Sequence, residues 1–327
     1  MLAAAARSEA WSARSRYAGA VQISNASVAV TGATGFLGGY LVDALRARGA
    51  RVIAVVRDRE KALRLLPADV ELRIAELADR AALTQSFCGV DAVISNAAVV
   101  SFRRPALTMQ TNVEGTRNVF EAIAAAGVQR AIAISSSAAY PFSFARIDEQ
   151  KPLRRLGHAH FGNAYGMSKA EGERSAWRIS QRSGIALTTF RPCGITGPSD
   201  PLLIAAIERV MRAPITAFPA YVAIGVAHAA DVAEAVMLAL EKPQIASGRA
   251  YNLQGETATL WQVADAWRRA GGRSPRLRIP VPLPFALRFD DTRARSELGW
   301  KPRTLDAILE EAVRSRNTAG PRRKTAA

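Results

Sequence analysis

A tyrosine and a lysine stand four residues apart in the segment YGMSK, at Tyr165 and Lys169. Residues with this spacing share one face of a helix, so their polar ends can converge. A free tyrosine has a pKa of roughly 10, and a nearby ammonium group favours its phenolate form. The pair could therefore exchange a proton with a bound molecule. The alternative interpretation is an ordinary pair at the start of a helix, because this spacing often occurs by chance.

Three serines, Ser135, Ser136 and Ser137, follow the apolar run at residues 130–134. Ligands of open parallel sheets bind beyond the carboxyl ends of the strands, so a hydroxyl group here could hydrogen-bond a substrate carbonyl. Alternatively, the serines only satisfy backbone groups where the strand ends.

The segment VAVTGATGFLGG places glycines at Gly32, Gly35 and Gly38, between an apolar run and an amphipathic helical stretch. In a dinucleotide-binding turn, the first glycine permits the tight turn and the second lets the backbone approach a pyrophosphate. The third lets helix and strand pack closely, and the helix N-terminus points its N–H groups at the phosphates. A plain tight turn is the alternative.

The second apolar run ends at Val56 and is followed by Arg57 and Asp58. An acidic residue near this point holds the ribose 2′-hydroxyl of NAD, whereas an arginine can reach the 2′-phosphate of NADP. Arg57 therefore favours NADP as the cofactor. NAD stays possible, because Asp58 lies only one position later. A solvated charge at the end of a strand is the third interpretation of Arg57.

Short apolar runs alternate with helical stretches over the first two thirds of the chain. The expected strands are 28–32, 50–58, 70–77, 91–98, 130–137 and 185–193, and the expected helices are 35–49, a stretch after Leu77 through about Phe87, 111–126 and 165–182. This alternation predicts an α/β fold, a Rossmann-type doubly wound parallel sheet with right-handed crossovers. Most of the runs are continuously apolar, as in a sheet that is covered on both faces.

The pattern changes after Gly197, where prolines cluster and the segments become shorter. We expect a flexible leader at 1–26 and a dinucleotide-binding domain at 27–197. A smaller, irregular substrate lobe at 198–313 would be interleaved with late strands of the sheet. The remaining residues, 314–327, read as a basic, disordered tail.

Composition excludes several classes of function. The formal net charge is +16, but the basic residues are dispersed and not interleaved with aromatic ones, so we expect no nucleic-acid partner. Two cysteines and three histidines, all scattered, predict no disulfide framework and no metal site. No run is long and apolar enough to cross a membrane, and we expect no membrane partner. A cytoplasmic location and a small-molecule substrate are the remaining expectations.

Taken together, the motifs resemble the extended short-chain dehydrogenase/reductase superfamily, often grouped as the NAD-dependent epimerase/dehydratase family. The similarity spans about residues 27–313 and is closest to the dihydroflavonol-reductase-like and hydroxysteroid-dehydrogenase-like branches. The motifs that carry it, in chain order, are TGATGFLG at 31–38, NAA at 96–98, TNVEGTRNV at 111–119, ISSSAAY at 134–140, YGMSK at 165–169, RPCGITGPSD at 191–200, HAADVAEAVMLAL at 228–240, GRAYNLQGE at 248–256 and ARSELGWKP at 294–302.

The resemblance implies catalytic roles for four residues. Tyr165 would be the general acid/base, and Lys169 would bond the nicotinamide ribose and lower the pKa of the tyrosine. Ser136 matches the catalytic serine or threonine of the family, and Ser137 is the rival assignment. Asn112 would position a helix kink or a water relay.

The resemblance also implies a set of cofactor contacts. The glycine turn and the start of the helix would hold the pyrophosphate, Glu76 and Leu77 would lie beside the adenine, and two alanines would line the ribose. The segment from Pro192 to Ile195 would pass the nicotinamide carboxamide. The implied cofactor-binding residues are Gly32, Thr34, Gly35, Phe36, Leu37, Gly38, Arg57, Glu76, Leu77, Ala97, Ala98, Tyr165, Lys169, Pro192 and Ile195.

Departures from the family pattern bear on the substrate. RPCGITGP lacks the asparagine that many nucleotide-sugar enzymes carry, and the stretch before His228 lacks their Arg-Asp-Phe type of motif. The prolines and apolar residues of 201–226 suit a less polar molecule.

The function expected from these features is NAD(P)-dependent interconversion of a carbonyl and a secondary alcohol. One alternative is a nucleotide-sugar epimerase or dehydratase that retains its cofactor, and another is a dinucleotide-binding scaffold or redox sensor without turnover. Members of the family are often homodimers through two long helices, here 111–126 and 165–182.

Overall fold

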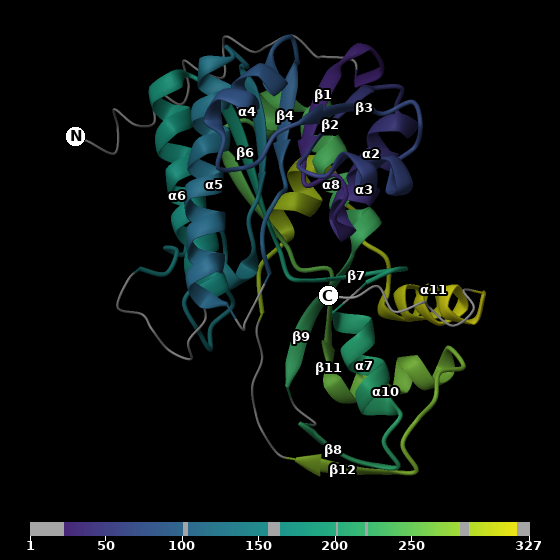
Figure 1. Ribbon diagram of the computed structural model, residues 1–327. Helices are drawn as coiled ribbons and strands as arrows, with labels where there is room; N and C mark the ends of the chain where they lie inside the picture. Colours follow the sequence, from purple (N-terminus) through teal and green to yellow (C-terminus); the bar gives the residue numbers. More distant parts are fainter. Residues whose placement is uncertain are drawn as a thin grey trace.

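Seven parallel strands form the central sheet of the computed structural model, which describes residues 23–100, 104–155, 164–200, 202–219, 222–281 and 288–318. Their order is β10-β6-β5-β4-β1-β2-β3, so the chain reverses its direction of travel between β1 and β4 (Figure 1). This is the Rossmann-type doubly wound arrangement that the sequence predicts. The strands are β1 (Ser27–Thr31), β2 (Arg51–Val56), β3 (Glu71–Ile74), β4 (Ala92–Ser95), β5 (Arg130–Ile134), β6 (Ala186–Pro192) and β10 (Arg249–Leu253).

Helices cover both faces of this sheet (Figure 1). Short 3₁₀ turns stand at η1 (Ile23–Asn25) and η2 (Ser137–Ala139), and a π-helical turn stands at η3 (Ala294–Leu298). The helices are α2 (Phe36–Ala47), α3 (Arg59–Leu65), α4 (Arg80–Phe87), α5 (Pro105–Ala125), α6 (Ala164–Ser183), α8 (Ala229–Glu241) and α9 (Pro243–Ala246).

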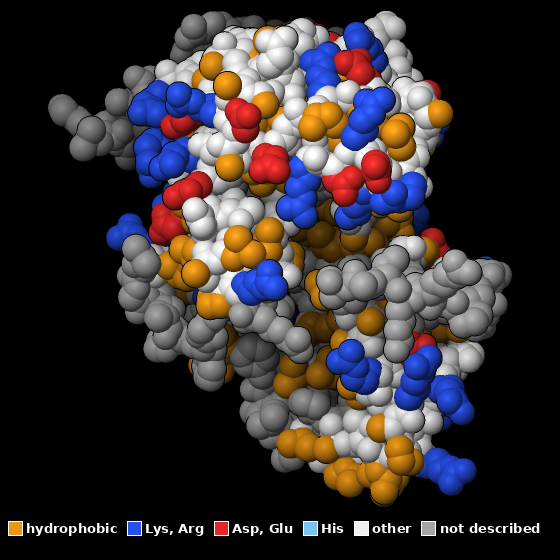
Figure 2. All heavy atoms as spheres, viewed as in Figure 1, with side chains coloured by type: hydrophobic (Ala, Val, Ile, Leu, Met, Phe, Trp, Pro, Cys, Tyr) orange, Lys and Arg blue, Asp and Glu red, His pale blue; other side chains and the backbone are white. Residues whose placement is uncertain are grey.

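A smaller lobe begins where β6 ends. It holds a three-stranded sheet, β11-β9-β7, and a two-stranded ribbon, β12-β8. Figure 2 shows a hollow between this lobe and the main sheet, with hydrophobic side chains inside it. The elements of the lobe are β7 (Gly194–Thr196), α7 (Leu203–Met211), β8 (Ile215–Pro219), β9 (Ala223–His228), β11 (Glu256–Thr259), α10 (Leu260–Arg269), β12 (Leu277–Val281) and α11 (Leu305–Thr318).

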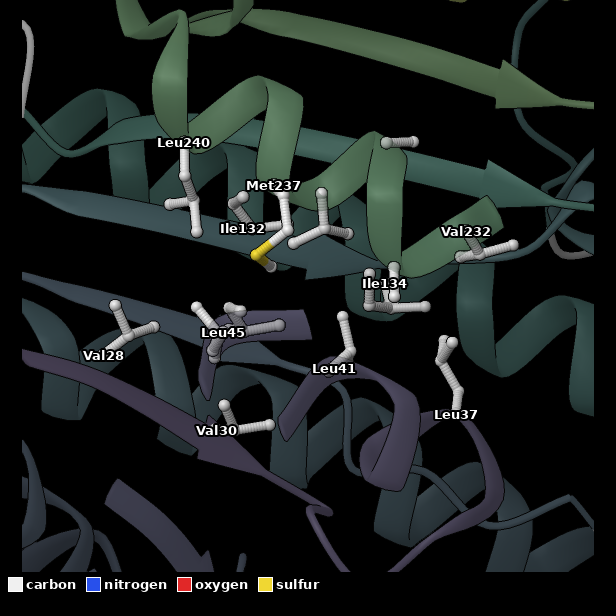
Figure 3. Close-up of a cluster of buried hydrophobic side chains, with 14 of the residues drawn as sticks. Val28, Val30, Leu37, Leu41, Leu45, Ile132, Ile134, Val232, Met237 and Leu240 are labelled. Atoms are coloured by element: carbon white, nitrogen blue, oxygen red, sulfur yellow. The ribbon is translucent and has the colours of Figure 1, made fainter. Parts of the chain in front are cut away.

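The core lies on the two faces of the main sheet. Successive residues of a strand point to opposite faces, so Val28 and Val30 join the cluster under α2 and α8, while Ala29 joins the cluster under α4, α5 and α6. Figure 3 shows the first cluster, where Leu41 of α2 and Met237 of α8 meet over β1 and β5. Burial on both faces explains why these strands read as continuous apolar runs.

Several boundaries differ from the sequence-based expectation, mostly where strands end earlier than expected. Helix α5 starts at Pro105 instead of residue 111, because proline suits the first position of a helix. Strand β3 covers only 71–74 of the expected 70–77, since it lies at the edge of the sheet. Helix α11 continues to Thr318, past the expected start of the tail at 314. Ile23 is buried, so the core begins inside the expected leader. The rest of the leader (1–22) and tail (319–327) lies outside the described residues.

Gly38 lets helix α2 approach the end of β1. A Cβ atom at this position would stand 2.1 Å from the carbonyl oxygen of Gly32, which leaves no room for any side chain. The next residue, Gly39, belongs to the same helix, but a Cβ atom there would meet nothing within 4 Å. The two neighbouring glycines therefore provide a matched pair.

We expect Gly38→Ala to lower the free energy of unfolding by roughly 3 kcal/mol through overpacking. Gly39→Ala should raise it by about 0.5–1 kcal/mol, because alanine loses less backbone entropy in a helix. Urea unfolding of both variants measures the two changes. Equal midpoints for the two variants would show that α2 does not approach β1 this closely.

Candidate active site

The glycine turn leaves the N-terminus of α2 open. Gly35 is the N-cap residue, so no side chain caps the helix, and its own N–H donates to Gly32 O at 3.0 Å. The N–H groups of Phe36 and Leu37 follow in the first turn of the helix. Backbone N–H groups without a capping side chain are suited to an anion such as a phosphate. Thr34 lies half-buried in the same turn.

The loop after β4 presses against this turn. Gly32 has φ +69°, and a Cβ atom on it would stand 2.7 Å from the Cα of Ala97. The hydroxyl of Thr31 accepts the N–H groups of Asn96 and Ala97 at 3.1 and 3.2 Å. Thr31 is not among the site residues predicted from the sequence, although its position directly before the first glycine could have indicated a role in the turn. Ala98 lies exposed just beyond this contact. The two loops therefore form one continuous edge.

Tyr165 and Ser136 come together at the carboxyl end of β5. The hydroxyl of Ser136 lies near the phenol of Tyr165 and acts on the pKa of the phenol as a hydrogen-bonding group. The hydroxyl of Ser136 also accepts the N–H of Ala138 at 3.1 Å, as the N-cap of η2. Ser137, the rival candidate, instead hydrogen-bonds the thiol of Cys193. The geometry therefore joins Ser136, and not Ser137, to the tyrosine.

Lys169 lies one helical turn beyond Tyr165, and its Nζ donates to the carbonyl oxygen of Ile134 at 2.7 Å. Burial lowers the pKa of Lys169 to about 8, although the carboxylate of Glu173 acts in the opposite direction. Burial raises the pKa of Tyr165, and the hydrogen bond from Ser136 only partly opposes this. The net pKa shift of Tyr165 is therefore upward, with the ammonium group of Lys169 turned toward Ile134. The expected lowering of the tyrosine pKa by Lys169 stays a prediction.

Asn112 is buried in α5 and ties two segments to each other. Its Nδ2 donates to Val99 O and to the hydroxyl of Ser168, both at 2.9 Å. Its Oδ1 accepts the N–H of Val99 at 2.7 Å. Asn112 thus holds the loop after β4 against α6. Its contact on α6 is Ser168, which directly precedes Lys169 in the chain. These contacts give Asn112 a positioning role, and the expected role at a helix kink or in a water relay stays a prediction.

The candidate residues at the other end of the edge follow β2 and β3. Arg57 is exposed, and Asp58 accepts the N–H of Lys61 at 2.9 Å as the N-cap of α3. Glu76 is exposed in the turn after β3. Leu77 is half-buried, and its carbonyl oxygen accepts a hydrogen bond from the side chain of Asn118 at 2.9 Å. The loop is therefore held in place.

The end of β6 supplies the last group. Pro192 is its buried final residue, and Ile195 of β7 packs against the main core. Between them, the thiol of Cys193 donates to Oε1 of Gln254 at 3.0 Å. Burial raises the pKa of this thiol to about 12, so it stays protonated. The segment from Pro192 to Ile195 therefore runs along the border between the sheet and the lobe.

A buried polar network that the sequence analysis missed lies beneath Lys169. Glu173, four residues further along α6, pairs with Arg191 of β6, whose Nε lies 3.0 and 3.1 Å from the two carboxylate oxygens. Arg191 also donates to the hydroxyl of Tyr140, which in turn donates to Oδ1 of Asn252 at 2.8 Å. Although burial acts to lower the pKa of Arg191, Glu173 and Tyr140 raise it overall. The four-residue spacing of Lys169 and Glu173 is visible in the sequence and places them on one face of a helix. Nothing in the sequence, however, identifies Arg191 of β6 as the partner of Glu173.

A small cavity separates Lys169 from Glu173. Its volume is about 20 Å³, enough for roughly one water molecule. Its walls come from β4, β5, α5 and α6, and the lining residues are Ser95, Ala97, Thr116, Ala133, Ile134, Ser135, Lys169, Gly172 and Glu173.

Within the described residues, no cluster of three or more His, Cys, Asp or Glu side chains could hold a metal ion. No helix in the same part of the chain is long and apolar enough to cross a membrane. The site therefore offers a helix N-terminus for phosphate groups at one end and a tyrosine with a serine partner at the other. Both stand on one edge of a doubly wound sheet, which is the design of a dinucleotide-dependent oxidoreductase.

Comparison with known proteins agrees with this class. Residues 28–253 match the NAD dependent epimerase/dehydratase family, and the chain belongs to that family, as an oxidoreductase of the extended short-chain dehydrogenase/reductase type. The predicted family membership is thus confirmed.

Three similar proteins illustrate the range of the family. Sterol demethylase protein B of Methylococcus capsulatus is 30% identical, over 87% of this chain and 96% of that protein. A 4-hydroxy-2-methyl-3-oxo-4-farnesyl-3,4-dihydroquinoline-1-oxide ketoreductase of Stigmatella aurantiaca is 30% identical, over 89% and 96%. The crystal structure of a UDP-glucose 4-epimerase from Thermotoga maritima superposes with a TM-score of 0.74 at 22% identity, over 88% and 98% of the two chains. The last comparison concerns the fold alone.

The lowered pKa of Lys169 predicts a pH-dependent stability. The unfolded chain keeps the proton up to about 10.5, whereas the folded chain releases it near 8. Between these values the unfolded state binds more protons, so the free energy of unfolding should rise with pH. Lys169→Met should remove this rise.

Urea unfolding of wild type and Lys169→Met at several pH values from 7 to 10.5 measures the effect. The exposed Lys301 provides the control, because Lys301→Met should follow the wild type. If the difference in the free energy of unfolding between wild type and Lys169→Met did not change with pH, Lys169 would not be desolvated.

Proposed function

We propose that this enzyme interconverts a carbonyl and a secondary alcohol in a predominantly apolar small molecule, with NADP as the preferred cofactor and NAD as the possible alternative. The observation that carries the proposal is the position of Tyr165 and Ser136 beside each other at the carboxyl end of β5, with Lys169 one helical turn away. An acid/base group and a second hydroxyl held together there can act on one substrate oxygen.

The residues fit a dinucleotide. A tight turn at Gly32 that packs against the backbone of Ala97, and a helix that begins without a side-chain cap, suit a pyrophosphate. The nicotinamide ring, when bound, supplies or accepts the hydride. Gly35, Phe36 and Leu37 would hold the phosphates, and Ala97, Ala98, Pro192 and Ile195 would line the path to the ring.

Tyr165 gives its proton to the carbonyl oxygen in reduction and takes it back in oxidation. Ser136 donates a hydrogen bond to the same oxygen as negative charge develops on it. The raised pKa of Tyr165 keeps the phenol protonated, as the step in which it gives its proton requires. Lys169 holds a positive charge one turn away, which would bind the cofactor ribose and stabilise the phenolate once the proton has left.

The preference for NADP rests on the end of β2. Asp58 is engaged as the N-cap of α3, so its carboxylate is already occupied by a backbone N–H. Arg57 is exposed at the same point and could meet a 2′-phosphate with a charge-assisted hydrogen bond.

The preference for an apolar substrate rests on the border between sheet and lobe. The hollow between them is lined with hydrophobic side chains in Figure 2. At Gly194, within the segment where many nucleotide-sugar enzymes carry an asparagine, a Cβ atom would approach Gly225 O to 3.0 Å. The loop after the β5 serines also carries two exposed aromatic rings in mutual contact, Phe142 and Phe144. The ketoreductase among the similar proteins acts, by its name, on a farnesylated molecule.

A nucleotide-sugar epimerase or dehydratase is the second candidate. The fold of the Thermotoga maritima epimerase is similar, and this fold is equally compatible with an epimerase and with a reductase. The two differ in one measurable respect, because an epimerase regenerates its cofactor within each turnover. A scaffold without turnover is the third candidate.

We propose a cytoplasmic homodimer. Its interface would consist of α5 and α6, which pack along each other on one outer face of the sheet (Figure 1). The compartment is inferred from the scarce cysteines.

Turnover should consume reduced cofactor in a one-to-one ratio with alcohol product. Assays with a panel of apolar ketones and of sugar nucleotides, followed by the absorbance of reduced nicotinamide, measure this ratio. Tyr165→Phe should lower kcat by roughly 10²–10⁴-fold, the range for a lost acid/base group. Turnover of a sugar nucleotide without net change in cofactor would overturn the reductase, and full activity of Tyr165→Phe would overturn the assigned chemistry.

Arg57→Ala should weaken the binding of NADP⁺ by roughly 10- to 100-fold, as expected for one lost charge-assisted contact. The binding of NAD⁺ should not change. Arg64→Ala, on the exposed side of α3, is the matched control. Calorimetric titration of each variant with both cofactors measures the effect, and an equal loss for NAD⁺ and NADP⁺ would refute the assignment of Arg57.

A further inference from the structure

The two-stranded ribbon of the lobe turns an apolar face to solvent. Strands β8 and β12 run parallel, with Leu277 opposite Ile215 and Ile279 opposite Ala217. Residues that are paired in this way, and residues two apart on one strand, lie on the same face. The exposed fractions of Ile215, Leu277 and Ile279 are 58%, 53% and 46%. The ribbon therefore presents a continuous apolar surface, at the lower tip of the molecule in Figures 1 and 2.

The opposite face of the ribbon contains Thr216 and Arg278, whose polar groups bond residues of the lobe. The guanidinium group of Arg278 lies 4.5 Å from the centre of the Trp261 ring and 2.7 Å from the carboxylate of Asp265. The hydroxyl of Thr216 donates to the carbonyl oxygen of Val210 at 3.1 Å. A sheet that covers a domain usually turns its apolar side inward and its polar side to water. This ribbon instead turns Ile215, Leu277 and Ile279 to water, so its outward face is suited to a covering partner.

The surroundings of the ribbon are strongly basic. Segments 202–219 and 260–281 contain seven arginines, against Glu208 and Asp265 as the acidic residues. Arg273 and Arg276 are exposed just before β12, and neither forms an ion pair with any residue in the described ranges. Figure 2 shows blue side chains beside the orange tip. A partner for this surface should therefore be apolar in depth and negatively charged at its boundary.

The size of the face decides between the possible partners. Two strands of five residues form a ribbon of roughly 17 Å by 10 Å, which is on the order of 170 Å². Stable protein interfaces bury about 800 Å² on each partner, so the ribbon is too small to hold a second copy. Docking to a lipid surface needs only a few apolar side chains and several basic residues near the headgroups.

We propose that the β8–β12 ribbon docks this protein onto the surface of an anionic lipid bilayer, with Ile215, Leu277 and Ile279 entering the interface and Arg273 and Arg276 meeting the lipid phosphates. The proposal replaces the expectation of no membrane partner, but only with binding to the surface of a bilayer. Such binding requires no helix that spans the membrane. The proposal is independent of the reaction catalysed.

Co-sedimentation of the full chain with vesicles tests the proposal. The vesicles contain either phosphatidylcholine alone or phosphatidylcholine with a third of phosphatidylglycerol. We expect binding to the anionic vesicles only, and binding that weakens as salt is added. The double variant Leu277→Ser/Ile279→Ser should lower the partition coefficient at least tenfold. The matched control is Leu63→Ser/Leu65→Ser, which removes two equally exposed apolar side chains from α3 and should bind like wild type.

A second pair of variants tests the charges. Arg273→Glu/Arg276→Glu should abolish binding, while Arg182→Glu/Lys301→Glu, with the same change in net charge, should largely retain it. All variants keep the basic residues 314–327, so binding through the tail alone would leave every variant equal and would overturn the proposal. It is also overturned if wild type ignores anionic vesicles, or if the serine variant instead changes the oligomeric state in light scattering.

Discussion

The contact between the glycine turn and the loop after β4 determines the geometry of the whole catalytic edge. Gly32 can lie against the backbone of Ala97 only because it has no side chain and adopts a positive φ. Thr31 adds two hydrogen bonds to the same loop. Asn112 then connects Val99 of this loop to Ser168 of α6. The glycine turn and helix α6, which carries Tyr165, are therefore linked by a short series of contacts, so neither can shift alone.

The charged residues beneath the site are also connected to one another by hydrogen bonds. Glu173 is buried, and its ion pair with Arg191 compensates the cost of removing both groups from water. Arg191 in turn bonds Tyr140, and Tyr140 bonds Asn252 of β10. The network thus joins α6, β6, β10 and the residue that follows η2. With Lys169 protonated, the three charges sum to one positive charge under the tyrosine, which is the sign that a developing phenolate requires.

The sequence predicts the sheet well, because continuous burial on both faces leaves an unmistakable apolar pattern at β1, β2, β4 and β5. It also identifies the Tyr165–Lys169 pair from helical spacing. It cannot choose between Ser136 and Ser137, since neighbouring residues point in different directions only after the strand and η2 are placed. The sequence also does not predict the pKa of Tyr165, because desolvation depends on what packs around the ring. The partner of Glu173 lies 18 residues away on another element, and sequence spacing does not reveal such contacts.

The division of labour between sheet and lobe follows from where the lobe is attached. Strand β7 begins at Gly194, two residues after β6 ends, and β11 begins three residues after β10 ends. The lobe is thus fastened to the same edge that holds Tyr165, while its own core around Trp267 and Leu309 is separate from the two cores of the sheet. Residues around Trp267 and Leu309 can therefore change without disturbing the packing that places Tyr165, whereas Ile195 of β7 and Ala227 of β9 belong to the contacts of the main core and cannot. The lobe thus has an outer part that packs separately and an inner border that is fixed by the sheet.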